Sequence, residues 1–433
     1  MDINRKIALD ILIEYDRQNT YPNLALKKYL RGIDDQRDKS FITALVYGVI
    51  EKRLLLDYYI SRTSSVKLKK INIVVINILR LGLYQLIFMS TPQSAACNTS
   101  VELAKKNGQY KSAGFVNAIL RKLASSYDSI ELPQETIKRL SVEYSMNIEI
   151  VSKLIDYFGV EGFKDYMISG EKLANDIYAC VNTIRTTDNE LISKLKDDGI
   201  EAAKTNYTGI IKISSHIDVE NSVCFKRGLF HIIGLPSYLC AKSVAPQSAD
   251  TVLDMCAAPG GKSFAMAYAS LDKANITSFD IHDHKLQNML VECKRLSLNN
   301  VHPVVFDSSV ENKEYIECAD RILCDVPCSG LGILFKKPDI KYNSVSFDEL
   351  VKLQSSILDN AALYLKHGGR LVYSTCTVNP DENERQVDAF IKRHSEFVID
   401  DTVEIVNGTF GSKLFTPQYD NCDGFYIAVL KKI

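Results

Sequence analysis

The chain has 433 residues, of which 46% are hydrophobic and 24% charged, as is typical of a soluble globular protein with two or three domains. Its formal net charge of −1 hides an asymmetry: residues 1–125 carry 20 Lys and Arg against 10 Asp and Glu, and the remainder carries 32 against 43. A basic segment joined to an acidic one favours a polyanionic partner for the first part, although a solvated helical surface explains the charge equally well.

Two features argue against a secreted or membrane-bound protein. The opening segment MDINRKIALD has no apolar core of signal-peptide length, and the most apolar stretch, residues 71–89, is interrupted by Arg80. That stretch therefore predicts a buried helix or helix pair. Eleven cysteines without any C-x-x-C spacing indicate free thiols in a reducing compartment, so we expect a cytoplasmic protein.

The first half of the chain is predicted to be mainly helical. In residues 1–125 apolar residues recur at three- and four-residue spacing, which predicts an all-helical bundle. Residues 126–235 are expected to form a small α+β linker domain, with a strand at 177–186 and a helix at 188–200.

From about residue 249 the pattern changes, and short apolar runs of strand character alternate with helical segments. This alternation predicts a mostly parallel sheet with helices on both faces over residues 236–433. In such sheets ligands bind beyond the carboxyl ends of the strands. The predicted strands are residues 251–257, 276–281, 302–307, 321–327, 370–376 and 425–430.

The first of these strands runs into a tight turn that contains Pro259, Gly260 and Gly261. Glycines let the backbone approach a ligand closely, and the helix that follows offers free N–H groups. The tail GGKS resembles a phosphate-binding P-loop, but that motif requires glycine at the position of Cys256. The G-x-G-x-x-G dinucleotide pattern is also absent, so a P-loop ATPase is a weak alternative.

Three aspartates lie at successive predicted strand ends. Asp280 lies 26 residues after Asp254 and is well placed to bond ribose hydroxyls, while Asp307 follows the third strand and is placed to hold an adenine amino group. Each aspartate taken alone could merely cap a helix. Together they favour a nucleoside cofactor without a large phosphate cluster, for which S-adenosylmethionine is the natural candidate.

Two cysteines follow the fourth and fifth strands. Asp325 and Cys328 end one strand and Cys376 ends the next, so we expect both thiols at one rim of the sheet. Asn379, Pro380 and Glu382 predict a helix N-cap, a first helical position and a capping partner just after Cys376, where N–H groups favour a thiolate. Buried inert thiols, a metal pair and a redox pair remain alternatives.

A zinc site is disfavoured by spacing. Cys318, Cys324 and Cys328 lie six and four residues apart, without the paired short spacings of structural zinc sites, and we expect no metal.

Four segments resemble motifs of the RNA cytosine-5 methyltransferases of the Nol1/Nop2/Sun family: DMCAAPGGKS, CDVPCSGLG, YSTCTVNPDENE and the final DGFYIAVL. Upstream segments such as GFVNAILRKL resemble a NusB-type helical RNA-binding domain. The resemblance implies a Rossmann-like, S-adenosylmethionine-dependent methyltransferase domain preceded by a NusB-like domain and the small α+β domain. It also implies ribosomal RNA as the partner, specifically 16S, and a monomer without metal or membrane.

The resemblance further implies roles for individual residues. Cys376 is the nucleophile that attacks cytosine C6, Cys328 assists product release, and Asp325 hydrogen-bonds the cytosine edge, held there as a protonated acid. Contacts to S-adenosylmethionine are implied for Cys256, Ala257, Ala258, Pro259, Gly260, Gly261, Lys262, Asp280, Asp307 and Asp325.

Other positions are less distinctive. Lys336, Lys337 and Lys341 are candidates for RNA phosphates, although a solvated basic loop is equally consistent. The chain has Ile233 and Gly234 where the family usually has a glutamine and an acidic residue, which affects the expected RNA-side geometry. A non-catalytic RNA-binding factor is the alternative from another class, and the intact Cys376, Cys328 and Asp325 argue against it.

Overall fold

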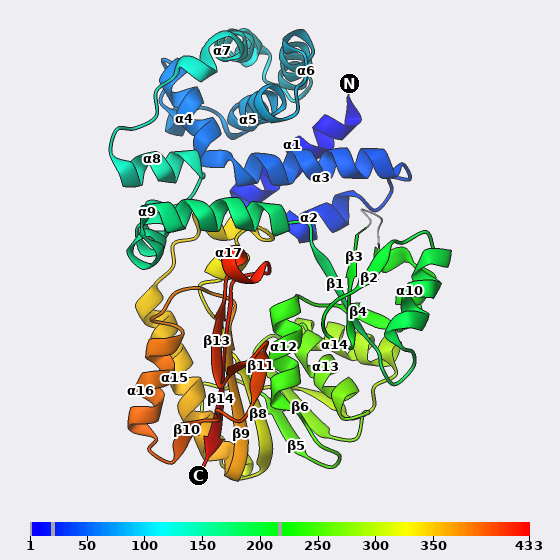
Figure 1. Ribbon diagram of the computed structural model, residues 1–433. Coiled ribbons are helices and arrows are strands. Elements are labelled where there is room, and N and C mark those ends of the chain that lie inside the picture. The colour runs from blue at the N-terminus through cyan, green and yellow to red at the C-terminus, as the bar shows by residue number, and fades with distance from the viewer. Residues whose placement is uncertain (1, 19–21, 215–218) are drawn as a thin grey trace. The chain divides into compact units, whose positions relative to one another are not determined.

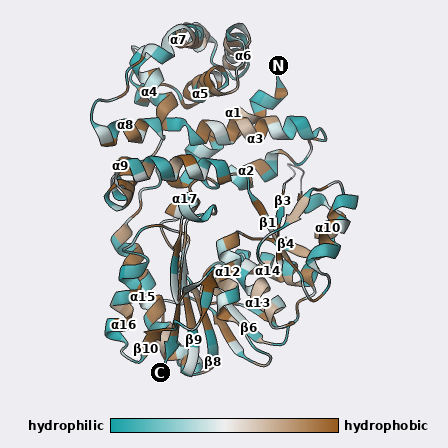
Figure 2. Ribbon diagram, in the orientation of Figure 1, coloured by the Kyte–Doolittle hydropathy of each residue, from teal (hydrophilic) through white to brown (hydrophobic). Residues whose placement is uncertain are grey.

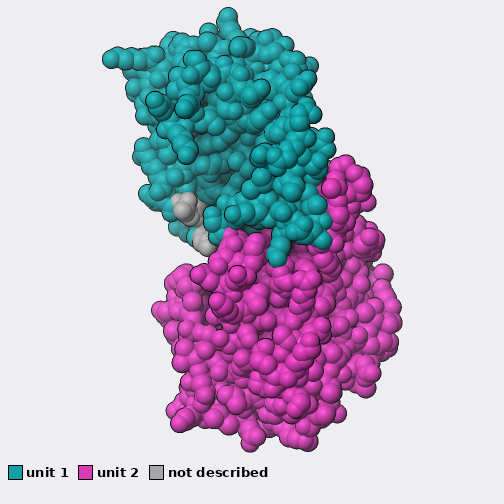
Figure 3. All heavy atoms as spheres, turned by 90° about the vertical axis from the view of Figure 1, so that its left-hand side faces the viewer, with its two compact units in different colours: residues 1–156, 337–344 teal, residues 157–336, 345–433 magenta. Residues whose placement is uncertain are grey.

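A computed structural model describes residues 2–18, 22–214 and 219–433 (Figure 1). The chain forms two compact units, coloured separately in Figure 3. The helical unit comprises residues 1–156 and 337–344, and the sheet unit comprises residues 157–336 and 345–433. The expected division into 1–125, 126–235 and 236–433 stays a prediction. Within the described ranges, no helix is long and apolar enough to span a membrane.

The helical unit confirms the predicted bundle. Its apolar core is centred on α5 (Ile73–Phe88), which packs against α1, α3, α6 and α7 and is buried over most of its length. The apolar stretch at 71–89 is thus one buried helix. The other helices are α1 (Ile3–Gln18), α2 (Pro22–Tyr29), α3 (Gln36–Glu51), α4 (Arg53–Thr63), α6 (Gln93–Lys106), α7 (Ala113–Ser126), α8 (Thr136–Glu143) and the first part of α9 (Ile148–Leu173).

Arg80 is buried within this bundle, with 6% of its surface exposed, and forms ion pairs there. Its Nε lies 2.7 Å from Asp57 Oδ1 and its Nη2 lies 2.8 Å from Asp57 Oδ2. Its Nη1 donates to Asp16 Oδ2 at 2.9 Å. The bidentate pair and the third bond tie α5 to both α4 and α1, which offsets the cost of burying the guanidinium group.

The sheet unit begins with a four-stranded antiparallel sheet. Its strand order is β2-β3-β1-β4, with β1 (Ile177–Val181), β2 (Ala202–Lys204), β3 (Ile210–Ile213) and β4 (Phe230–Ile232). The predicted strand at 177 and helix at 188 are both present. The helix is α10 (Asp188–Asp197), and Thr187 and Glu190 form a capping box at its start.

The second sheet has the order β10-β14-β9-β8-β5-β6-β7, with β13 also paired to β14. Strands β5 to β9 pair in parallel, whereas β14 pairs antiparallel with its neighbours. This is the predicted Rossmann-like sheet. The strands are β5 (Thr251–Asp254), β6 (Asn275–Asp280), β7 (Val301–Val305), β8 (Ala319–Asp325), β9 (Leu365–Thr375), β10 (Phe397–Ile399), β13 (Ser412–Phe415) and β14 (Phe425–Lys432).

Helices cover both faces of this sheet, because successive strand residues point to opposite sides. Val252 and Leu323 belong to the core under α12 (Leu235–Val244), α13 (Gly261–Ala269) and α14 (Asp283–Leu296). Leu253 and Ile322 belong to the core under α15 (Phe347–Tyr364) and α16 (Glu384–Arg393). Figure 1 shows the two helix groups on opposite sides, and Figure 2 shows apolar residues concentrated along the strands.

The remaining elements are short. They are α11 (Val223–Lys226), β11 (Glu404–Val406), β12 (Thr409–Phe410), α17 (Pro417–Asp420) and several 3-10 turns.

We predict that Arg80→Ala lowers the free energy of unfolding by about 3–5 kcal/mol, because it leaves the half-buried Asp57 carboxylate without its bidentate partner and removes one of the bonds to Asp16. Urea denaturation followed by the helical circular dichroism signal measures the change. The matched control is the exposed Arg62→Ala, expected to change stability by no more than about 0.5 kcal/mol. Equal effects of the two substitutions would show that the cluster contributes no stability.

Candidate active site

The carboxyl ends of three adjacent parallel strands bring the predicted catalytic residues together. β8 lies between β5 and β9, as Figure 1 and the strand order both show. In register, Asp254 of β5 pairs with Leu323 of β8, and Asp325 of β8 pairs with Ser374 of β9. The glycine turn after β5 and the two cysteine loops after β8 and β9 therefore leave the sheet at the same edge.

Asp325 and Lys262 form an ion pair at this edge. Lys262 Nζ lies 2.5 Å from Asp325 Oδ2, and Ser374 Oγ donates to Asp325 Oδ1 at 2.8 Å. Burial lowers the pKa of Lys262, but the charge of Asp325, the hydrogen bond with Asp325 and the nearby thiols of Cys240 and Cys376 together raise that pKa above the usual value. Both oxygens of Asp325 thus accept hydrogen bonds. The expected protonated state of Asp325 stays a prediction.

The two cysteines are in direct contact. Cys328 Sγ and Cys376 Sγ lie 3.2 Å apart, both are half-buried, and neither is in a disulfide. The hydrogen bond with Cys376 and burial raise the pKa of Cys328 well above its usual value. Cys328 is therefore harder to deprotonate than an ordinary thiol.

Gly332 fixes the distance between the two loops. Its N–H donates to the carbonyl of Cys376 at 3.0 Å, and its own carbonyl accepts from Gly424 N at 2.9 Å. A Cβ at position 332 would lie 1.9 Å from the carbonyl oxygen of Gly424. Only glycine allows this close approach, which links the loops after β8 and β9 to the start of β14.

The helix start predicted at Asn379–Glu382 was wrong. α16 begins at Glu384 with Asn383 as its N-cap, eight positions after Cys376. Asn383 is instead bonded back to the strand end, because Thr375 Oγ1 donates to its Oδ1 at 2.5 Å and its Nδ2 donates to Thr377 O at 3.0 Å. The corner at Cys376 is therefore held by hydrogen bonds of the side chain of Asn383, the N-cap residue of α16.

The glycine turn has the backbone geometry that its sequence predicted. Gly260 has φ 107°, and a Cβ there would lie 2.5 Å from the ring of Phe264. The N–H of Ala257 donates to Phe279 O at 2.7 Å, which anchors the turn to β6. α13 starts directly after the turn, so its first N–H groups face the edge of the sheet.

Asp280 and Asp307 lie at the ends of the neighbouring strands β6 and β7. Asp280 Oδ1 accepts the N–H of His282 at 2.8 Å, and Asp307 Oδ1 accepts the N–H of Ser309 at 2.9 Å. Both thus have a local turn-forming role. Beside Asp280, the apolar side chain of Ile281 is 59% exposed. Their part in binding a ligand stays a prediction.

Sequence reasoning missed His231, which supports the glycine turn from β4. Its Nε2 lies 3.0 Å from Gly261 O, and its Nδ1 lies 3.3 Å from the hydroxyl of Tyr268. Burial lowers the pKa of His231 to about 3, so the ring is neutral and its Nε2–H donates to Gly261. A lone histidine in an apolar strand gave no signal of this contact.

The unusual Ile233 is buried in the same core and packs toward Gly261. The departure from the family pattern thus lies beside the glycine turn.

The candidate phosphate-binding lysines differ in their surroundings. Lys336 Nζ lies 2.8 Å from Asp423 Oδ2. Lys341 is 1% exposed and lies 3.7 Å from Glu51 within the helical unit. The interpretation of Lys341 as a phosphate ligand was therefore wrong, because its ammonium group is buried.

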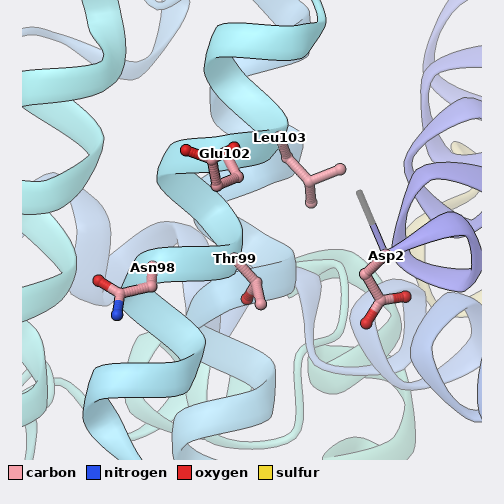
Figure 4. Close-up of a pocket in the computed structure, with 5 residues that line it drawn as sticks. All are labelled: Asp2, Asn98, Thr99, Glu102 and Leu103. Carbon is pink, nitrogen blue, oxygen red and sulfur yellow. The ribbon is translucent and has the colours of Figure 1, made fainter.

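Features elsewhere do not add to this site. A pocket in the helical unit is lined by Asp2, Asn98, Thr99, Glu102 and Leu103, none of them a predicted site residue (Figure 4). In the part of the chain that the structure describes, no group of three or more His, Cys, Asp and Glu side chains could hold a metal ion.

Two protein families match two separate parts of the chain. The family described as 16S rRNA methyltransferase RsmB/F matches residues 241–431, and the NusB family matches residues 2–125. The chain is 34% identical to the "Probable ribosomal RNA small subunit methyltransferase B" of Bacillus subtilis, over 99% of this chain and 98% of the relative. It is 31% identical to the protein of the same name from Synechocystis, over 99% of both.

Solved structures share the fold. The crystal structure of PH0851 has a TM-score of 0.85 at 23% identity and covers 98% of both chains. The structure of NSun6 from Pyrococcus horikoshii with SFG has a TM-score of 0.58 at 22% identity and covers 65% of this chain and 97% of that one.

Burial raises the pKa of Asp254 to about 7. Since an unfolded Asp titrates near 3.9, the unfolded state binds fewer protons between these values, and stability should fall as pH rises toward 7. We predict that Asp254→Asn gains about 2 kcal/mol in unfolding free energy relative to the wild type between pH 5 and pH 7. Denaturation at each pH tests this, with the exposed Asp283→Asn as control; a difference independent of pH would contradict it.

Proposed function

Because the chain belongs to the family of ribosomal RNA small subunit methyltransferases B, we propose that it methylates C5 of a cytosine in 16S ribosomal RNA, with S-adenosylmethionine as donor. The observation that carries the proposal is the 3.2 Å contact of the Cys328 and Cys376 thiols beside the glycine turn. Inert thiols need no such placement, and the absence of neighbouring ligands in the described chain disfavours a metal pair.

The chemistry requires a nucleophile, since C5 of an aromatic cytosine is a poor acceptor for an electrophilic methyl group. The Cys376 thiolate adds to C6, which breaks the aromaticity and makes C5 enamine-like. S-adenosylmethionine supplies the electrophilic methyl group. Loss of the C5 proton then expels the Cys376 thiolate and restores the ring, with Cys328 assisting release.

Asp325 and Lys262 are placed to orient the base. Their ion pair lies at the end of β8, adjacent to the strand that carries Cys376. In the structure the two oxygens of Asp325 accept hydrogen bonds from Lys262 and Ser374. A cytosine exocyclic amine is a donor that a carboxylate accepts, so the base would exchange with one of these partners.

The cofactor site fits the residues around the glycine turn. Gly260 and Gly261 leave the backbone open to a ligand, and Asp280 is placed for the ribose hydroxyls. The exposed Ile281 offers an apolar surface for an adenine ring, and Asp307 offers an acceptor for its amino group. The related fold of NSun6 with SFG, an analogue of S-adenosylmethionine, supports this assignment.

The helical unit supplies the RNA-binding surface in this proposal. Residues 2–125 match the NusB family, and residues 1–125 carry 20 Lys and Arg against 10 Asp and Glu. Lys and Arg side chains contact phosphates without reading sequence. The target cytosine has to leave its stack, which costs a few kcal/mol and less in a loop.

We predict that Cys376→Ala abolishes both methylation and any covalent RNA adduct. Cys328→Ala should instead accumulate a protein–RNA adduct that survives a denaturing gel, because product release is impaired. Incubation with S-adenosylmethionine and 16S ribosomal RNA measures both, and Cys318→Ala serves as a half-buried cysteine control. An adduct in the Cys376 variant would reverse the two roles.

Asp280→Ala is predicted to weaken S-adenosylmethionine binding by about tenfold, through loss of charge-assisted hydrogen bonds to the ribose. Isothermal titration calorimetry with the cofactor alone measures the affinity. Asp283→Ala, an exposed aspartate on the same loop and helix start, should bind as the wild type does. Unchanged affinity in Asp280→Ala would remove Asp280 from the cofactor site.

A further inference from the structure

Glu382 is a fully buried residue of the Cys376 loop, 0% exposed, whose carboxylate reaches the Cys328 loop. Here the Cys328 loop denotes residues 326–332 and the Cys376 loop residues 376–383. The Glu382 carboxylate accepts four hydrogen bonds, from Ser329 N at 2.9 Å, Ser329 Oγ at 2.5 Å, Gln354 Nε2 at 2.9 Å and Asn379 Nδ2 at 2.9 Å.

The two bonds from Ser329 join the Cys328 loop to the Cys376 loop. Ser329 directly follows Cys328 in the chain, and both its N–H and its hydroxyl reach Glu382. The same hydroxyl lies 2.8 Å from Thr377 Oγ1, next to Cys376. On the far side, the Tyr373 hydroxyl donates to the carbonyl of Glu382 at 2.6 Å and ties it to β9. A single side chain thus joins the backbones that carry both sulfur atoms.

The four donors are neutral groups, so they satisfy the carboxylate without cancelling its negative charge. Buried polar networks of this kind are costly unless every member is paired, and they rigidify the segments that they join. A glutamine amide would offer an acceptor oxygen to the same donors with less desolvation. Stability alone therefore does not explain why the buried side chain at position 382 is a charged one.

The charged groups around the cysteines are arranged asymmetrically. Lys262 of α13 interacts favourably with Cys376, and Asp325 of β8 holds Lys262 in place. Glu382 acts on Cys328, whose pKa is raised by its hydrogen bond with Cys376, by burial, by the charge of Cys376 and by that of Glu382. The N–H of Ser329, the residue after Cys328, donates to Glu382 at 2.9 Å, which places the carboxylate beside the backbone that carries Cys328.

We propose that Glu382 is a positioning residue for the two cysteines, which ties the Cys328 loop to the Cys376 loop and keeps the shared proton on Cys328. Cys376 is thereby left as the sulfur that accepts a hydrogen bond and acts as nucleophile. Glu382 touches neither substrate nor cofactor in this scheme and acts through Ser329 and the backbone. The proposal deepens, and its kinetic part rests on, the proposed two-cysteine function.

The first test measures thiol reactivity in the absence of RNA and cofactor. Iodoacetamide labelling of the native protein at pH 7, mapped by mass spectrometry, gives the ratio of Cys376 to Cys328 alkylation. We expect Glu382→Gln to lower this ratio by about tenfold, which corresponds to one unit of relative acidity. Asp388→Asn removes the same charge from an exposed position on α16 and should leave the ratio unchanged.

A purely structural role predicts a different result. Loosened loops would raise the labelling of both cysteines together and lower the melting temperature, with the ratio unchanged; that outcome would overturn the proposal. If Glu382→Gln fails to fold, the same labelling ratio is measured in Ser329→Ala. This variant removes the hydrogen bond from the Ser329 hydroxyl to Glu382 and changes only a small side chain. The ratio should then fall in the same direction, and an unchanged ratio would again overturn the proposal.

Kinetics provide a second readout. In Glu382→Gln we expect kcat for RNA methylation to fall by about 10- to 100-fold, as for other small misplacements of reacting groups, with KM within about twofold. The alkaline limb of the kcat profile should move about one unit lower. Wild-type kcat in this variant would contradict the positioning role. Because the labelling test needs neither RNA nor cofactor, it separates failure of this proposal from failure of the proposed function.

Discussion

The sulfur atoms of Cys328 and Cys376 lie 3.2 Å apart because the strands that carry them are neighbours in a parallel sheet. Each thiol follows the carboxyl end of its strand, and parallel pairing sets both ends at one edge. Gly332 then links the two loops, because its N–H donates to the carbonyl of Cys376 and its carbonyl accepts from the N–H of Gly424. Two residues 48 positions apart in sequence become one chemical unit through sheet topology, and the rest of the site is arranged around it.

The glycine turn is coupled to this unit by one ion pair. Lys262 belongs to α13, which starts at the turn, and Asp325 belongs to β8, which leads to Cys328. The pair connects the part of the site suited to a cofactor with the part suited to a base. His231 supports the same turn from β4 of the antiparallel sheet. This contact gives β4 a role in shaping the turn.

Local sequence signals were sufficient for the sheet and for the loops that carry the cysteines. Apolar runs, Gly-Gly turns and acidic strand ends depend on residues close together in the chain, and each was found where predicted. The start of α16 could not be predicted in this way. Asn379, Pro380 and Glu382 fit a helix start locally, but the side chain of Glu382 is captured by donors from the Cys328 loop.

The same limitation explains the other differences. Lys341 appears basic and accessible in sequence, but its segment, residues 337–344, belongs to the helical unit and pairs it with Glu51. The partner of Asp325 is Lys262, which lies 63 positions away. The tertiary fold brings such partners together, so they cannot be predicted from composition or from the spacing of motifs.

Bisulfite sequencing of 16S ribosomal RNA tests whether the chain installs 5-methylcytosine as we propose, since 5-methylcytosine resists conversion. We expect one 16S cytosine to be protected in the wild-type strain and converted in a strain lacking this protein. Protection should return with the wild-type chain but not with the Cys376→Ala variant. Identical conversion patterns in the two strains would contradict the proposal.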